Sequence, residues 1–132
     1  LGNLAVNGLA IDPVTTSTLY ASTWGPLFRS TNGGGSWSPA GNGLPSEGLS
    51  GVVVHSTMPA TVYAAVYGSG VYRSTDAGAT WSPVNDGLTD LRVMTLALDP
   101  EGTSTLYAGL LDGGVWQASP PTPVELLTFA VE

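Results

Sequence analysis

The side chains in this chain that could do chemistry are mostly carboxylates. Ten Asp or Glu residues accompany three arginines and one histidine, His55, and the 132 residues include no lysine and no cysteine. Without cysteine there is neither a thiol nucleophile nor a thiolate zinc site, and one histidine cannot build a histidine cluster for a metal ion. We therefore expect no metal and no cofactor.

Paired acids could hydrolyse a glycosidic bond, since one carboxyl group protonates the leaving oxygen while the other acts as base or nucleophile. The candidates are Asp90 and Asp112, with Glu47 as a third acid. Nothing in the sequence marks any two of them as facing each other across a cleft. The sequence therefore favours a protein that is not an enzyme.

The formal charge of −7 restricts the partners. Nucleic-acid backbones and anionic membranes bind clustered Lys or Arg, whereas Arg29, Arg73 and Arg92 stand in separate parts of the chain. No run of apolar residues reaches the roughly 18 that a membrane span requires. We expect neither a nucleic-acid partner nor a membrane span.

An internal repeat defines the elements that must position these side chains. Three passages match: Leu9-Ala-Ile-Asp-Pro13, Val52-Val-Val-His55 and Leu96-Ala-Leu-Asp-Pro100. Three tyrosines that follow them keep the same spacing of 43 or 44 residues: Tyr20, Tyr63 and Tyr107. The chain is therefore built from about three copies of one unit.

A period of this length with four short strands is typical of a β-propeller blade. In the second repeat we expect strands over residues 50–55, 61–67, 70–74 and 80–84, separated by tight turns. The sequence thus predicts an all-β fold of propeller-type blades, each with four antiparallel strands. The repeats cover about residues 1–43, 44–87 and 88–119.

Two segments one repeat apart share a motif: Ser30-Thr-Asn-Gly-Gly-Gly-Ser-Trp37 and Ser74-Thr-Asp-Ala-Gly-Ala-Thr-Trp81. The motif resembles the Asp-box, or BNR repeat, of sialidase-like, xyloglucanase-like and sortilin-like β-propellers, with Asn32 in place of the aspartate. The resemblance implies a secreted or bacterial cell-surface module more than any one activity. The arginine cluster and the Tyr and Glu pair that sialidases use are missing.

The motif has a structural explanation. An aspartate or asparagine can accept backbone N–H bonds across a turn, a glycine supplies positive φ, and a tryptophan can anchor the hairpin between sheets. The residues in these positions are Ser30, Asn32, Gly34, Trp37, Ser74, Asp76, Gly78 and Trp81. A calcium or ligand role is the alternative, although one carboxylate per turn is a small ligand set for a hard cation.

Two other repeated positions also have a structural interpretation. Arg29 and Arg73 occupy the same place in the third strand, which favours support of the blade over ligand contact. His55 takes the place of Asp12 and Asp99 in the other repeats. We therefore expect His55 to support a turn rather than to act as a catalytic base.

One face of such a fold gathers the turns between the second and third strands and the connections between blades. The turns contribute Trp24, Tyr67 and Asp112, and the connections contribute Glu47, Asp90 and Arg92. Aromatic rings beside carboxylates could bind a sugar, because rings pack on its apolar face and carboxylates accept its hydroxyl groups. Solvated loop tips or oligomer contacts are the alternative.

Closed propellers typically have four to eight blades, so about three leave the ring incomplete, and two copies would supply about six. After a Pro-rich spacer at 120–123, we expect a strand over 124–132 that is apolar on both faces. Its apolar residues include Val124, Leu126, Leu127, Phe129 and Val131. The strand either completes the third blade or is donated to a neighbouring copy.

These observations favour a non-enzymatic protein, extracellular or at the bacterial cell surface, that acts through self-assembly into an oligomer or fibre or through protein interaction. Its expected partners are further copies of itself, with a glycan as the other candidate. A carbohydrate-binding propeller module and a fragment of a glycoside hydrolase are the alternative functions.

Overall fold

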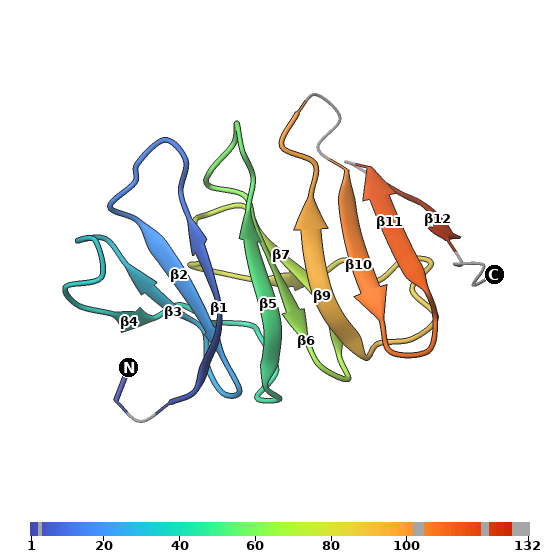
Figure 1. The fold of residues 1–132 in the computed structure, drawn as a ribbon, viewed down its shortest axis with the longest axis horizontal. Helices are drawn as coiled ribbons and strands as arrows, with labels where there is room; N and C mark the ends of the chain where they lie inside the picture. The colour runs from blue at the N-terminus through green and yellow to red at the C-terminus, as the bar shows by residue number, and fades with distance from the viewer. Residues whose placement is uncertain (3, 102–104, 120–121, 128–132) are drawn as a thin grey trace.

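The computed structural model describes residues 1–2, 4–101, 105–119 and 122–127. Within these residues, twelve β strands form three antiparallel sheets of four strands each (Figure 1). Sheet 1 contains β1 (Val6–Ile11), β2 (Leu19–Thr23), β3 (Phe28–Ser30) and β4 (Ser38–Pro39). Sheet 2 contains β5 (Leu49–Val54), β6 (Val62–Val66), β7 (Gly70–Ser74) and β8 (Ser82–Pro83). Sheet 3 contains β9 (Val93–Leu98), β10 (Leu106–Leu110), β11 (Val115–Ser119) and β12 (Thr122–Leu127).

The strand order in each sheet follows the chain, and each strand pairs with the next. The first strands of the three sheets, β1, β5 and β9, lie side by side, and the sheets fan out from them (Figure 1). This arrangement confirms the predicted all-β fold, with three propeller-type blades in the described residues. No helix among these residues is long and apolar enough to span a membrane.

The fourth strands of sheets 1 and 2 are shorter than the sequence predicts. The strand predicted over 80–84 is only β8, Ser82–Pro83, and β4 has the same two-residue length. Pro83 has no N–H to donate to a ladder, so a longer strand at this sheet edge is not favoured. Val84 N–H still donates to the carbonyl oxygen of Val71, just beyond the strand.

The fourth strand of sheet 3 is β12, which pairs with β11 of the same chain. The register places Glu125 opposite Gln117, and β12 begins at Thr122, so it includes part of the segment interpreted as a spacer. Residues 128–132, and with them Phe129 and Val131 of the predicted strand, lie outside the described residues.

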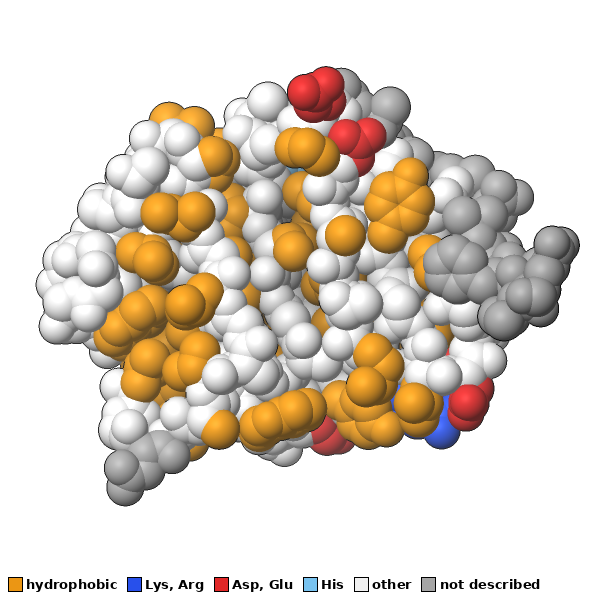
Figure 2. Space-filling view, in the orientation of Figure 1, with side chains coloured by type: hydrophobic (Ala, Val, Ile, Leu, Met, Phe, Trp, Pro, Cys, Tyr) orange, Lys and Arg blue, Asp and Glu red, His pale blue; other side chains and the backbone are white. Residues whose placement is uncertain are grey.

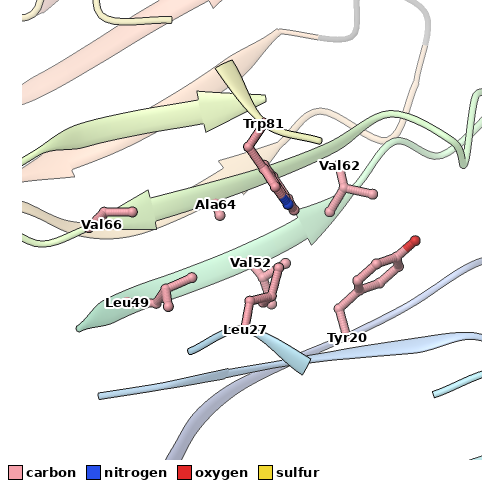
Figure 3. Packing of buried hydrophobic residues seen from close by; sticks show 8 residues of the cluster. All are labelled: Tyr20, Leu27, Leu49, Val52, Val62, Ala64, Val66 and Trp81. Carbon is pink, nitrogen blue, oxygen red and sulfur yellow. The ribbon is translucent and has the colours of Figure 1, made fainter. Parts of the chain in front are cut away.

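Two hydrophobic clusters hold the sheets together. Between sheets 1 and 2, Tyr20 and Leu27 point toward residues of sheet 2 and toward Trp81 (Figure 3). Between sheets 2 and 3, Tyr63 and Val71 pack with Trp116 and its neighbours. Sheet 2 is therefore covered on both faces, which explains why every residue of β6 is buried and apolar.

Candidate functional site

The two motif turns connect the third strand of a blade to the fourth. In the second repeat, the Ser74 hydroxyl accepts the Gly78 N–H (2.8 Å) and donates to Asp76 Oδ1 (2.7 Å). Asp76 also accepts the N–H (2.8 Å) and the hydroxyl of Thr80. These hydrogen bonds, that of the Thr80 hydroxyl above all, lower the pKa of Asp76 to about 2.

The first repeat forms the same turn with an amide. Asn32 Oδ1 accepts the Ser36 N–H (2.8 Å) and the Ser30 hydroxyl (2.9 Å), while Ser30 Oγ accepts the Gly34 N–H (2.9 Å). An amide and a carboxylate therefore close the turn in the same way. Both side chains are already used in local hydrogen bonds. Among the described residues, no cluster of three or more His, Asp or Glu could hold a metal ion.

The motif turn of the second repeat also meets the neighbouring sheet. Tyr20 of sheet 1 donates its hydroxyl to the Ala77 carbonyl oxygen (3.1 Å), and the Trp81 indole donates to the Ala40 carbonyl oxygen (2.7 Å). Gly78 has a φ of 89°, and a Cβ at this position would lie 3.3 Å from the Tyr20 ring. The motif thus docks one blade on the next. Trp37, with no sheet before it in the described residues, is only half-buried.

Arg29 lies at this junction. Its guanidinium sits 5.9 Å from the centroid of the Tyr20 ring, a distance that allows cation–π attraction. Its side chain and that of Asp76 line a cavity of about 400 Å³ between the two motif turns. Arg73 occupies the matching position in β7, opposite Tyr63.

On the opposite face, the structure brings three of the predicted charged residues together. Arg92 Nε binds Asp90 Oδ1 at 2.9 Å, and Arg92 Nη2 binds Asp112 Oδ2 at 2.9 Å. Asp90 also accepts the Asp112 N–H (3.0 Å). The hydrogen bonds from Arg92 lower the pKa of Asp90 to about 2.

The predicted aromatic residues meet in a separate place. Trp24 and Tyr67 line a cavity of about 510 Å³ together with Asn7, Ser50 and Met94. Glu47, Asp90 and Asp112 are not among its lining residues, and Glu47 is exposed. The structure therefore places the rings and the carboxylates side by side on one face without combining them in one site.

Asn7, Ser50 and Met94 are not among the site residues that the sequence predicts. They share one repeat position, near the start of β1, β5 and β9, 43 and 44 residues apart. Since their side-chain types differ, no motif marks them, and only the repeat spacing could have placed them together.

The outer faces of sheets 1 and 3 are the second feature of functional interest. Tyr20 and Tyr63 are 1% and 4% exposed, whereas Tyr107, at the same repeat position in sheet 3, is 37% exposed. Conversely, Val52 in sheet 2 is 6% exposed, whereas Leu9, its counterpart in sheet 1, is 65% exposed. Figure 2 shows hydrophobic side chains gathered over sheet 1.

We call the outer face of sheet 1, with Leu9 and Ile11, the leading face, and the outer face of sheet 3, with Tyr107, the trailing face. Within the molecule, each sheet presents its tyrosine to the following sheet, which receives it on the face that carries the Leu9-type residues. The leading and trailing faces therefore have the two halves of one repeated interface.

No protein-family model matches the chain, and no curated protein is similar enough to count as a relative. Solved structures do resemble it. A GH74 enzyme from Niastella koreensis has a TM-score of 0.75 and 29% identity, covering 89% of this chain and 20% of that one. YCF48 from Cyanidioschyzon merolae has a TM-score of 0.69 and 15% identity, covering 98% and 38%.

A third similar structure is the extracellular domain of a protein described as a hybrid two-component system from B. thetaiotaomicron, with a TM-score of 0.68 and 18% identity. The match covers 93% of this chain and 17% of that one. The chain thus spans between 17% and 38% of the length of these three structures. Together with the three sheets, the comparisons define the chain as β-propeller in class, with about three blades.

Proposed function

We propose that this protein is a non-enzymatic, extracellular scaffold whose blades assemble with those of a second copy. The observation that carries the proposal is the difference in exposure at equivalent positions. Among the described residues, no sheet covers the trailing and leading faces, and Tyr107 and Leu9 are exposed there, while their counterparts between two sheets are buried. Large apolar surfaces of this kind mark interaction sites on folded proteins.

The repeated geometry supports a head-to-tail arrangement of the two copies. The Tyr20 hydroxyl reaches the Ala77 carbonyl oxygen, and the Tyr20 ring lies beside Gly78. The counterparts in the first repeat are Gly33 and Gly34, which also have positive φ. Tyr107 of one copy would accordingly donate its hydroxyl to the Gly33 carbonyl oxygen of the next.

The number of blades also supports assembly. Two copies would supply about six blades, within the usual range for a closed propeller, and a contact that does not close would extend into a fibre. Since β12 pairs within its own sheet, the proposed contact uses whole sheet faces rather than donation of the C-terminal strand.

Two points bear on the alternative of a glycoside hydrolase fragment. The GH74 neighbour favours it at the level of the fold. A catalytic acid, however, needs a raised pKa, whereas Arg92 holds the pKa of Asp90 at about 2 and also binds Asp112.

The extracellular location that we propose agrees with the extracellular domain among the similar structures.

The test is the mass of the protein in solution by light scattering after size exclusion, at several concentrations. We expect a mass of two chains or more, and a single chain for Leu9→Asp, because the carboxylate would be buried without a partner in the interface. Circular dichroism checks that Leu9→Asp keeps its β structure, as the exposure of Leu9 leads us to expect.

The matched control is Val14→Asp, which places the same charge at an exposed site in the β1–β2 turn. This variant should keep the mass of the parent. A parent that remains a single chain at every concentration would overturn the proposal.

A further inference from the structure

The cavity between Trp24 and Tyr67 has the chemistry of a binding site that the proposed assembly does not use. Its volume of about 510 Å³ lies in the range of ordinary ligand sites. Trp24 is 61% exposed, and Tyr67 and Met94 are also exposed although they are large and apolar. The lining residues come from all three sheets of one chain, so the cavity needs no second copy.

The polar groups of the cavity are largely occupied. Asn7 donates to the Leu49 carbonyl oxygen (2.6 Å) and accepts the Ser22 hydroxyl (2.7 Å), and the Ser50 hydroxyl donates to the Val93 carbonyl oxygen. A sugar would need several free hydrogen-bonding groups, whereas the rings and Met94 offer mainly apolar contact. The cavity therefore suits a neutral apolar side chain better than a polyol.

Acidic residues alternate with the apolar tips along the edge of this cavity. A Cβ at Gly48, directly after Glu47, would lie only 2.8 Å from the Trp24 carbonyl oxygen, and the Gly48 carbonyl oxygen accepts the Tyr67 N–H (3.0 Å). On the other side of Tyr67, the Leu91 carbonyl oxygen accepts the Gly68 N–H (3.0 Å). Glu47 and Asp90 are thus carried by the two connections that flank Tyr67.

The net charge of this edge is negative. Asp90 and Asp112 both bind Arg92, and the side chain of Asp112 is largely exposed. Together with Glu47, the edge therefore has three carboxylates and one guanidinium. The whole chain has a net charge of −7 and no lysine. Charge complementarity therefore selects a cationic partner along the edge.

Figure 2 shows hydrophobic side chains along the lower side of the view, where the turns between second and third strands lie.

We propose that the Trp24–Tyr67 cavity binds an extended, basic peptide segment, with one neutral apolar side chain inserted between the two rings and flanking Lys or Arg residues beside Glu47 and Asp112. Aromatic-lined grooves are a recurrent means of holding extended peptides. The rings supply most of the affinity, and the carboxylates select the sign of the partner's charge.

The test uses a fluorescein-labelled Lys-Lys-Pro-Phe-Pro-Lys-Lys peptide and measures fluorescence anisotropy. We expect saturable binding that weakens with added salt and is lost when Phe becomes Ala or when every Lys becomes Glu. Trp24→Ala and Tyr67→Ala should each weaken binding about tenfold or more, as truncation of an aromatic anchor does. Glu47→Gln should weaken it less and reduce its salt dependence.

The matched control is Met58→Ala, which removes an exposed apolar side chain from the β5–β6 turn on the opposite face. It should leave the affinity unchanged, and circular dichroism should show that each variant is folded. Cellohexaose, competing against the labelled peptide and titrated alone, tests the sugar alternative.

Three outcomes would overturn the proposal. They are no binding of the basic peptide, binding that Trp24→Ala and Tyr67→Ala leave intact, and binding of cellohexaose alone with loss in the same two variants. The last result would assign the cavity to a glycan. None of these results depends on the number of chains in the assembly.

Discussion

The turn after the first strand of each blade uses different acceptors for the same backbone donors. Asp12 Oδ1 accepts the N–H groups of Val14 and Thr15, and His55 Nδ1 accepts those of Thr57 and Met58. Accepting through Nδ1 places the proton of the neutral ring on Nε2. That nitrogen is buried and has no hydrogen-bond partner among the described residues. His55 thus replaces an aspartate in a structural role.

At the residue scale, Asp76 predicts how stability depends on pH. Its pKa of about 2 in the folded chain lies below the usual value near 4, so folding favours the ionised form. Its contribution is therefore fully present above about pH 4 and is lost as the pH falls toward 2. We expect the free energy of unfolding to decrease as the pH is lowered from about 4 toward 2, and we expect this decrease to be smaller in Asp76→Asn.

Urea unfolding at several pH values between 5 and 2 measures this effect on the parent and on Asp76→Asn. Asp90 has a similarly lowered pKa through Arg92, so the variant should lose part of the pH dependence and keep the rest. Asn32 shows that an amide is accepted in the same turn. Identical pH profiles for the two proteins would contradict the role given to Asp76.

At the element scale, the motif turn is both a hairpin and a docking surface. Ala77 has a φ of 58° where the first repeat has Gly33, and Gly78 has a φ of 89° beside Tyr20. Gly78→Ala should destabilise the chain by about 1–2 kcal/mol, because it adds a Cβ in the left-handed region and within 3.3 Å of the Tyr20 ring.

Ala77→Gly is the matched variant, because it removes a Cβ from the same region of backbone conformation. It should be neutral or stabilising by up to about 1 kcal/mol, since the strain it relieves offsets the added chain entropy. Urea unfolding of both variants gives the comparison. If Ala77→Gly lost as much stability as Gly78→Ala, backbone strain in the left-handed region would not explain the effects at these two positions.

The elements show why part of the site could be predicted and part could not. The spacing of Tyr20, Tyr63 and Tyr107 predicted the number and length of the blades, because a repeated residue takes the same position in each sheet. The ion cluster of Arg92 was not predictable as a cluster, because Asp112 reaches it only after β9, β10 and their turn have brought the two segments together. Asn7, Ser50 and Met94 share a position but no side-chain chemistry.

At the scale of the whole molecule, sheet 2 serves as an internal reference for the other two. Its Val52 and Tyr63 show how an interior blade is covered on each side. The sequence could predict that about three blades fall short of a ring, but it could not say which residues would be left exposed. Alternation along a strand shows which side chains share a face of the sheet. It does not show which face a neighbouring sheet covers, and this depends on how the three sheets pack.

The most direct test of the central claim is complementation between two variants, each with one face disabled. Leu9→Asp lacks a working leading face, and Tyr107→Asp lacks a working trailing face. We predict by light scattering that each variant alone is a single chain and that an equimolar mixture forms a 1:1 pair through the one intact interface. A mixture that stays at the mass of single chains, or either variant alone assembling as the parent does, would contradict head-to-tail assembly.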